Sequence, residues 1–542
     1  MKRRQLLHIA LAAALSLTTL SCAGIRTLIA TDTPIPPTET PAPTKTPKPT
    51  STPTPIPTEV AYTPVFEPAA CPFNVPAGAT VDCGYVIVPE DRSDDPTDTV
   101  RLAVAVYRSF SDNPAPDPVI YLQGGPGMDS LSWSAGFYGL LVKPVLAERD
   151  FIFFDQRGTG RSEPELDCFE LKLLFMQDVG RGFPPEGMVE RYTNALMMCR
   201  DRLVIEGVNL AAYTSADSAA DVKDIAAVLG YGEQPSGLFP VNLYGISYGT
   251  RLAQAVMRDY PEIVRSAVLD SVVPIDVSLY QDISSEDSLQ VLFDGCAADP
   301  ACSTAYPDLE AVFYDLVEQL DAEPVVVEIP DPRTGRSYAI EVNGARFSSA
   351  AVWAMSSSYA IPLIPQAIYQ ARDGNYEPVV YGMAAPLLMY ESLSLGMMIS
   401  VECHDHAFAT TPDALDDLIA DFHLTEALGL FSLSGEDVIE ICQMWGAAPF
   451  DPRDGEPLTS DIPTLVLAGE YDSTTPPLFG RRVAETLSAG YYFEFPGEGH
   501  APSAGGAGNC AQRILLAFLD DPTAEPDSAC IAEMEGPDFV VP

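Results

Sequence analysis

The chain has 542 residues, of which 47% are apolar, so it is long enough to bury one large core together with a sizeable insertion. Its 76 acidic residues outnumber its 30 basic residues and give a formal net charge of −46. This charge argues against nucleic acid or an anionic membrane surface as a partner, and it favours solubility outside the cell.

The first 22 residues have the pattern of a bacterial export signal. Three basic residues at positions 2–4 precede an apolar stretch at 6–20, and Cys22 follows a small residue, as at a lipoprotein cleavage site. We expect Cys22 to be lipidated and to become the mature N-terminus, with Thr19 standing where leucine is usual. Ordinary secretion and an uncleaved N-terminal anchor are the alternatives.

A segment of low complexity follows this leader. Between Thr31 and Thr58, 20 of 28 positions are Thr or Pro, a composition that favours extended polyproline-like conformations and does not pack. At about 3.1 Å per residue, such a segment reaches roughly 90 Å. We therefore expect residues 23–66 to be a disordered tether. No later segment has the length and apolarity of a membrane span, so the remainder is predicted to be an exported soluble domain.

Ten cysteines remain when Cys22 is set aside, and none of them has the C-x-x-C spacing of zinc or redox sites. An even number of cysteines indicates disulfides formed in an oxidising compartment. We favour five local pairs in sequence order, which would staple loops, over long-range crossing pairs. The ten are Cys71, Cys83, Cys168, Cys199, Cys296, Cys302, Cys403, Cys442, Cys510 and Cys530.

Short apolar runs then alternate with longer helical segments, which is typical of a mostly parallel sheet covered by helices on both faces. Almost two hundred residues with mainly helical patterns separate the two strands at 267–273 and 464–468. Such an insertion predicts a cap over the carboxyl edge of the sheet, where open α/β sheets bind their ligands. The predicted strands span 100–107, 119–122, 151–154, 241–244, 267–273, 464–468 and 491–495.

We therefore divide the chain into five parts. They are a leader at 1–22, a tether at 23–66, an N-terminal core part at 67–275, a helical cap at 276–445 and a C-terminal core part at 446–542.

Residues 245–249 read Gly-Ile-Ser-Tyr-Gly and lie between a predicted strand and a helical run at 251–258. This is the strand–turn–helix context of a nucleophile elbow, in which glycines relieve crowding around a strained, exposed serine. The context favours Ser247 as a nucleophile over a glycine-rich turn without catalytic role.

Two further motifs precede this pentapeptide: Gly-Gly-Pro-Gly at 124–127 and Asp-Gln-Arg-Gly-Thr-Gly-Arg-Ser at 155–162. With the elbow, an acid in a late turn and a Gly-His near the end, they resemble the α/β-hydrolase fold. More narrowly, the order is similar to the proline iminopeptidase and tripeptidyl aminopeptidase family of exported serine exopeptidases. The resemblance runs from Cys71 to the C-terminus and is least specific in the cap. Gln123 stands where many relatives have histidine, which affects only local hydrogen bonding.

The 155–162 motif is expected to serve as scaffold, with Arg157 and Arg161 pairing with Asp155 or with other acids near the site.

A serine alcohol needs a base of near-neutral pKa, and imidazole is the usual one. Outside the leader the chain has four histidines: His404, His406, His423 and His500. Only the last follows the late acid turn, so it alone fits the hydrolase order Ser, Asp, His.

The orienting acid is expected in the turn after the strand at 464–468, where Glu470 and Asp472 are both possible. We choose Asp472, because it lies deeper in the loop and matches the Gly-x-x-Asp of the family that the chain resembles. The alternative for Asp472 is an Asx-turn residue before Pro476. The predicted mechanism is nucleophilic attack by Ser247, deprotonated by His500, through an acyl-enzyme.

Two backbone N–H groups are expected to form the oxyanion hole, one from Tyr248 and one from Gly125, since Pro126 has no N–H. No metal and no organic cofactor is implied by these residues.

The segment Glu402-Cys403-His404-Asp405-His406 is the most acidic and histidine-rich part of the predicted cap. An exopeptidase must recognise a free α-ammonium, and Glu402 or Asp405 is our candidate for that role. On a strand, Glu402, His404 and His406 would share one face, which raises a metal site as a weaker alternative. Ordinary surface residues beside a Cys403–Cys442 disulfide are the third interpretation.

Three functional hypotheses follow. The first is an exported, membrane-tethered serine aminopeptidase that releases prolyl-type single residues or tripeptides from free N-termini. The second is a carboxylesterase or lipase with the same triad. The third is a non-catalytic surface-binding protein on the same fold. We expect peptide substrates and contact with a membrane only through the N-terminal lipid, with the oligomeric state left open.

Overall fold

The computed structural model describes residues 62–92, 98–178, 188–234, 237–277, 285–330, 337–382, 392–407, 411–414, 435–505 and 509–542. The predicted leader with Cys22, most of the tether and His423 lie outside these ranges. Within them, no helix combines the length and apolarity needed to cross a membrane.

The chain enters the fold earlier than the tether boundary at 66 suggests. The Tyr62 hydroxyl hydrogen-bonds to the Asp224 carboxylate, and strand β1 (Val65–Ala69) pairs antiparallel with β2. Residues 62–66 therefore belong to the folded part of the protein.

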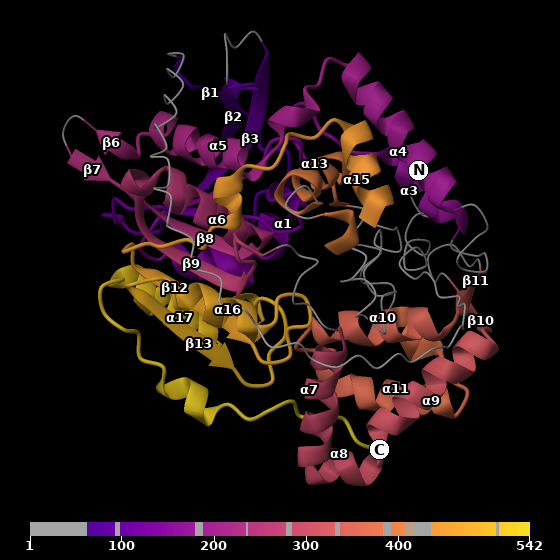
Figure 1. Ribbon diagram of the computed structural model, residues 1–542. Helices are drawn as coiled ribbons and strands as arrows, with labels where there is room; N and C mark the ends of the chain where they lie inside the picture. The colour runs from indigo at the N-terminus through magenta and orange to yellow at the C-terminus, as the bar shows by residue number, and fades with distance from the viewer. Residues whose placement is uncertain are drawn as a thin grey trace, which may run out of the picture.

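One nine-stranded sheet forms the centre of the molecule (Figure 1). Its order is β1-β2-β3-β5-β4-β8-β9-β12-β13. The pairs from β5 to β13 are parallel, and β1, β2 and β3 add an antiparallel edge. Every strand expected from the sequence is present, with bounds shifted by at most three residues. The strands are β1 Val65–Ala69, β2 Val81–Pro89, β3 Thr99–Tyr107, β4 Val119–Leu122, β5 Phe151–Phe154, β8 Val241–Ser247, β9 Val264–Val272, β12 Thr464–Gly469 and β13 Gly490–Phe495.

Helices cover both faces of this sheet because its central strands are apolar on both sides. Helices α5, α6 and α16 bury aliphatic side chains against one face, and α1, α2 and α17 bury theirs against the other. The helices are α1 Leu131–Gly136, α2 Lys143–Val145, α3 Phe169–Asp178, α4 Met188–Ile205, α5 Ser215–Val228, α6 Tyr248–Asp259, α7 Ser285–Ala298, α8 Pro300–Ala305, α9 Leu309–Ala322, α10 Gly344–Met355, α11 Ile364–Arg372, α13 Leu395–Asp405, α15 Gly435–Trp445, α16 Pro477–Ala484 and α17 Cys510–Asp520.

The long insertion between β9 and β12 forms two separate groups (Figure 1). Helices α7 to α11 share one apolar core, beside the hairpin of β10 (Val325–Pro330) and β11 (Ser337–Val342). Helices α13 and α15 instead share a core with α3 and α4, which precede the elbow in the chain. The cover of the sheet is therefore built from two stretches of chain, whereas the division drawn from the sequence placed α3 and α4 in the core.

Five disulfides join the ten cysteines in sequence order, as expected: Cys71–Cys83, Cys168–Cys199, Cys296–Cys302, Cys403–Cys442 and Cys510–Cys530. This number of disulfides is typical of proteins that fold in an oxidising compartment outside the cytoplasm.

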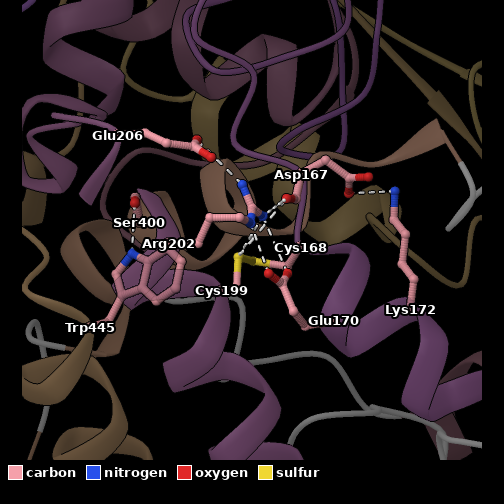
Figure 2. The surroundings of a disulfide bond; sticks show 9 residues. All are labelled: Asp167, Cys168, Glu170, Lys172, Cys199, Arg202, Glu206, Ser400 and Trp445. Carbon is pink, nitrogen blue, oxygen red and sulfur yellow. Dashed lines mark hydrogen bonds and ion pairs between the residues drawn. A yellow bond between two sulfur atoms is a disulfide. The ribbon is translucent and has the colours of Figure 1, made fainter. Parts of the chain in front are cut away.

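Figure 2 shows the second disulfide, which joins the start of α3 to α4. Beside it, Arg202 donates to the Glu170 carboxylate at 2.7 Å and to the Asp167 carbonyl at 2.7 Å. On the neighbouring helices, Trp445 Nε1 donates to Ser400 Oγ at 2.8 Å, which satisfies the indole of a fully buried side chain. Covalent and polar contacts together fix this half of the cover.

The 155–162 motif packs as scaffold, and Arg157 pairs with another acid and not with Asp155, one of the two arrangements expected. Arg157 is fully buried and makes a two-pronged ion pair with Asp221 of α5, at 2.8 and 2.7 Å. Asp155 accepts no arginine side chain; its carboxylate takes the backbone N–H groups of Ser130, Leu131 and Arg161 at 2.7 to 2.8 Å. Both interactions tie the loops at the carboxyl edge of the sheet to the core.

We predict that Asp221→Asn destabilises the fold strongly, because it removes the nearer counter-charge of the buried Arg157 guanidinium and leaves only Asp217, at 3.8 Å. Removing one partner of a buried ion pair lowers the free energy of unfolding by about 3 kcal/mol or more. Chemical denaturation followed by tryptophan fluorescence measures the change, with Glu310→Gln on exposed α9 as the matched control. An unfolding midpoint equal to that of the control would contradict the prediction.

Candidate active site

The strand–turn–helix expected around Ser247 is present. β8 runs into α6 through Ser247, whose backbone has φ 56° and ψ −128°. A positive φ at a residue other than glycine is strained, and such strain is found where the surrounding structure enforces it. The flanking glycines allow it: a Cβ on Gly249 would lie 1.9 Å from the Leu122 carbonyl oxygen, and one on Gly245 would lie 2.4 Å from that of Gly249. Both glycines are required by close backbone approach.

His500 and Asp472 are in direct contact. They follow the adjacent parallel strands β13 and β12, and Nδ1 of the histidine lies 2.9 Å from Oδ2 and 3.1 Å from Oδ1 of the carboxylate. Burial alone would lower the pKa of His500, but the charge and hydrogen bond of Asp472, together with the charge of Asp270, outweigh it and the net shift of the pKa is upward. Burial likewise opposes ionisation of Asp472, yet contact with His500 leaves its pKa below the usual range. The carboxylate is thus ionised at neutral pH.

Glu470, the other acid considered for this role, has a different function. Its Oε2 accepts the Gly497 N–H at 2.9 Å, which ties the turn after β12 to the loop after β13.

Ser247 emerges at the same edge of the sheet. β8 pairs with β9, which pairs with β12, and all run parallel, so their carboxyl ends meet at one edge. A Cβ on Gly124 would lie 3.0 Å from Ser247 Cβ, which places the glycine loop directly beside the serine. The fold therefore brings the glycine loop, Ser247, Asp472 and His500 to one edge from four separate segments.

Thr475 belongs to this arrangement and was not expected from the sequence. Its Oγ1 donates to Asp472 Oδ2 at 2.7 Å and lies 3.2 Å from His500 Nδ1. The N–H groups of Thr474 and Thr475 both donate to Asp472 Oδ1 at 2.9 Å. Asp472 therefore forms an Asx-type turn and also contacts the histidine, so the two interpretations of this residue are compatible. The signal available in the sequence was a hydroxyl residue three positions after the acid.

The glycine loop is held by Gln123, the residue that departs from the pattern of many relatives. Its Oε1 accepts the Tyr121 hydroxyl at 2.7 Å and the Gly124 N–H at 3.1 Å, and its carbonyl accepts Gln156 Nε2 at 2.9 Å. Gly125 follows with φ 118°, a conformation that favours glycine. In the described part of the chain, no protein acceptor is found for the N–H of Gly125 or that of Tyr248.

The cover touches both catalytic loops. At the start of α13, the Ser394 N–H donates to the Gly127 carbonyl at 2.8 Å. Beyond the end of α10, the Ser356 carbonyl accepts the backbone N–H of His500 at 3.0 Å, and Ser358 Oγ accepts that of Gly499 at 3.0 Å. The position of the cover and the position of the catalytic loops are therefore linked.

Residues 402–405 lie on helix α13, not on a strand, so Glu402 and His404 do not share a face. Asp405 is buried and fully engaged: it accepts Arg251 Nε at 3.0 Å and Ser215 Oγ at 2.6 Å, and it contacts His404 Nδ1 at 2.7 Å. An amine-binding role for Asp405 is therefore not supported, because its oxygens already have partners.

A ligand cluster different from the one considered in the sequence is also present. Possible ligand atoms of His404, Asp405 and Asp454 lie within 4.8 Å of one another. Arginines already neutralise both carboxylates, since Arg251 pairs with Asp405 and Arg258 pairs with Asp454 at 2.5 Å. Ion pairs therefore hold one oxygen of each carboxylate, although Asp454 Oδ2 has no hydrogen-bond partner among the described residues.

Glu402 differs from Asp405, whose two carboxylate oxygens both have partners. Its Oε2 is buried, and no hydrogen-bond partner for it is found among the described residues. Burial and the neighbouring Asp405 raise the pKa of Glu402 to about 8, with Arg251 opposing the shift. Burial, Asp405 and, more weakly, Glu402 raise the pKa of the hydroxyl of Tyr248, the residue that follows Ser247.

We predict that Thr475→Val lowers kcat about tenfold with little change in KM, because one fewer donor orients the carboxylate that holds the histidine; a tenfold loss corresponds to about 1.4 kcal/mol. Steady-state hydrolysis of a chromogenic substrate measures it. Thr475→Ser, which keeps the hydroxyl, is the control and should retain most of the activity. A loss in Thr475→Ser as large as that in Thr475→Val would contradict the prediction, because serine keeps the hydroxyl that donates to Asp472.

Comparison with known proteins agrees with this geometry. The chain is 24% identical over 486 residues to the serine protease Hip1 of Mycobacterium tuberculosis, covering 84% of this chain and 88% of that one. It is 28% identical over 251 residues to the tripeptidyl aminopeptidase of Streptomyces lividans, covering 44% of each. It is 26% identical over 281 residues to carboxylesterase B of M. tuberculosis, covering 49% of this chain and 51% of that one.

The family model described as the alpha/beta hydrolase fold matches residues 117–506, which include the glycine loop, the elbow, the late acid and the final histidine. These residues make up most of the chain. The chain belongs to the α/β-hydrolase family.

Proposed function

We propose that this protein is an exported serine aminopeptidase that cleaves peptides from a free N-terminus through a triad of Ser247, His500 and Asp472. The observation that carries the peptidase specificity is the buried, unpartnered Oε2 of Glu402 on the helix that covers the elbow. The named relatives include a serine protease and a tripeptidyl aminopeptidase, which supports peptide substrates.

The triad gives each residue a defined role. His500 Nε2 takes the proton of Ser247 Oγ as the serine attacks the scissile carbonyl, and Asp472 holds Nδ1 and stabilises the imidazolium that forms. The N–H groups of Gly125 and Tyr248 are proposed to hold the oxyanion. The histidine then returns its proton to the leaving amine and activates the water that hydrolyses the acyl-enzyme.

Glu402 is proposed to bind the α-ammonium of the substrate. A buried carboxyl without a partner is costly, because it has lost its hydration without gaining a hydrogen bond. A substrate ammonium supplies both the missing donor and a counter-charge, so its binding would ionise Glu402. Arg251 is paired with Asp405 and therefore does not form an ion pair with Glu402. The carboxylate of Glu402 is thus left to bind the substrate ammonium.

We also propose that the protein is exported and held at the cell surface by its N-terminal segment. The leader at 1–22, lipidation of Cys22 and the Thr/Pro-rich tether would hold the catalytic part outside the cytoplasm, in agreement with the five disulfides. The membrane is then contacted only through the lipid.

We predict that Ser247→Ala abolishes hydrolysis, lowering kcat by roughly 10⁴-fold or more, because no other nucleophile replaces the serine oxygen. Purified enzyme and variant are assayed on tripeptidyl and single-residue chromogenic amides with free N-termini. Circular dichroism shows that the variant is folded. Activity that survives the substitution would remove Ser247 from its role.

The same substrates with acetylated N-termini, and short-chain esters, separate the peptidase from the carboxylesterase. Cleavage of blocked peptides as fast as free ones would contradict an aminopeptidase. Rapid ester hydrolysis without any amide hydrolysis would establish the carboxylesterase in its place.

We predict that Glu402→Gln raises KM for free-amine substrates about tenfold or more, because a charge-assisted hydrogen bond of about 1.5–3 kcal/mol is lost. In the wild type, KM for these substrates should fall as pH rises through about 8, since the raised pKa of Glu402 keeps it mostly protonated at lower pH. The variant should lose this dependence.

Glu310→Gln, on the exposed face of α9, serves as the matched control and should leave KM unchanged. An unaltered preference of Glu402→Gln for free over blocked N-termini would refute the assignment while leaving the triad intact.

A further inference from the structure

A second buried acid lies beneath the loop that carries His500. Asp270 is fully buried on β9, between the two strands that lead to Ser247 and to Asp472. In the register of the sheet it pairs with Ile246 on β8 and with Leu467 on β12. Nothing in the triad uses this carboxylate, although it occupies the centre of the parallel sheet.

Asp270 and the residue after it hold the histidine loop at two points. Asp270 Oδ2 accepts the Ser503 N–H at 3.1 Å and also the Ser503 hydroxyl. Ser271 Oγ accepts the Ala501 N–H at 2.8 Å. Both Ser271 and Ala501 have positive φ, 59° and 60°, so this contact joins two strained backbone positions. The loop that begins at His500 is therefore fixed to β9.

The second oxygen of Asp270 is not used for this anchoring. Oδ1 is buried, and no hydrogen-bond donor to it is found among the described residues. Buried carboxylate oxygens are normally hydrogen-bonded, and an exception marks a group that serves a purpose other than packing.

The groups that face Asp270 come from every neighbouring element. Tyr121 on β4 and Tyr244 on β8 face it, and burial raises the pKa of both hydroxyls so far that they stay neutral. The remaining charged neighbours are His500 and Asp472. Burial raises the pKa of Asp270 to about 7, and Ser503 and His500 oppose that shift. In turn, Asp270 adds to the upward shift of the pKa of His500.

We propose that Asp270 is a positioning residue for His500: it anchors the histidine loop through Ser503, and its negative charge stabilises the imidazolium formed when Ser247 attacks. The proposal rests on the proposed role of His500 as the base. The proton moves from Ser247 Oγ to His500 Nε2 and later to the leaving amine. Asp270 takes no proton in these steps. It acts only through its electrostatic field and through its hydrogen bonds to Ser503 in the histidine loop.

The first test compares Asp270→Asn with Asp155→Asn. Asparagine keeps an acceptor for Ser503 but removes the charge, so the pKa of His500 falls. The acid limb of the profile of kcat/KM against pH should then move to lower pH by roughly half a unit, and kcat at its plateau should drop. Asp155 is equally buried and its pKa is also raised to about 7, but its carboxylate is held by the N–H groups of Ser130, Leu131 and Arg161 and not by the histidine loop. Its variant should leave the acid limb in place.

An acid limb of Asp270→Asn at the wild-type position, in a folded variant, would overturn the proposal. A shift of the acid limb of equal size in Asp155→Asn would also overturn the proposal, because it would show that any loss of a buried carboxylate from this sheet lowers the pKa of His500.

A second measurement does not depend on the variant folding or on activity. Titration of the full chain with ¹³Cε1-labelled histidine, with His500→Gln to assign the signal, should give two steps for His500, since ionisation of Asp270 changes its surroundings. A single-step curve would contradict the coupling, whether or not the protein proves to be an aminopeptidase.

Discussion

The parallel register of β8, β9, β12 and β13 is the constraint on which the site depends. In such a sheet every carboxyl end lies at the same edge, so residues that follow different strands meet there. Ser247 follows β8, Asp472 follows β12 and His500 follows β13, although more than two hundred residues separate the first from the second. The backbone contacts of Gly249 with Leu122 and of Gly469 with Gly499 are so close that no side chain fits between the segments. The meeting of these residues at one edge is thus a consequence of parallel strand pairing and of close backbone contact between neighbouring segments.

Buried charges divide into two classes around this edge. The scaffold class is satisfied: Arg157 pairs with Asp221, Arg251 pairs with Asp405, and Asp155 accepts three backbone N–H groups. Two acids near the elbow and the histidine, Glu402 and Asp270, each keep one buried oxygen without a partner among the described residues. Because desolvation without a hydrogen bond costs free energy, such positions are expected where a substrate or a transition-state charge supplies what is missing.

The cover is bonded to the two loops that carry the proposed site. The carbonyl of Ser356 accepts the backbone N–H of His500, and Ser394 donates to Gly127 in the glycine loop. Movement of either half of the cover would therefore disturb the base or the loop proposed to hold the oxyanion. The joint packing of α13 and α15 with α3 and α4, stapled by Cys168–Cys199 and Cys403–Cys442, opposes such movement.

The sequence by itself determined the fold class, the strands and the order of Ser247, Asp472 and His500; it favoured the five local disulfide pairs, and the structure decided them. Strand periodicity, glycine at a strained turn and the scarcity of histidine are local signals, so they can be read without knowing the fold. Only the tertiary structure decided the roles of Thr475 and Asp270. It also showed that Asp405 is paired with Arg251. These roles depend on partners that lie far away in the chain or across a tight turn. The same reason explains why α3 and α4 were assigned to the core: helical periodicity shows that a helix has an apolar face, while the surface that this face meets is set by packing between distant segments.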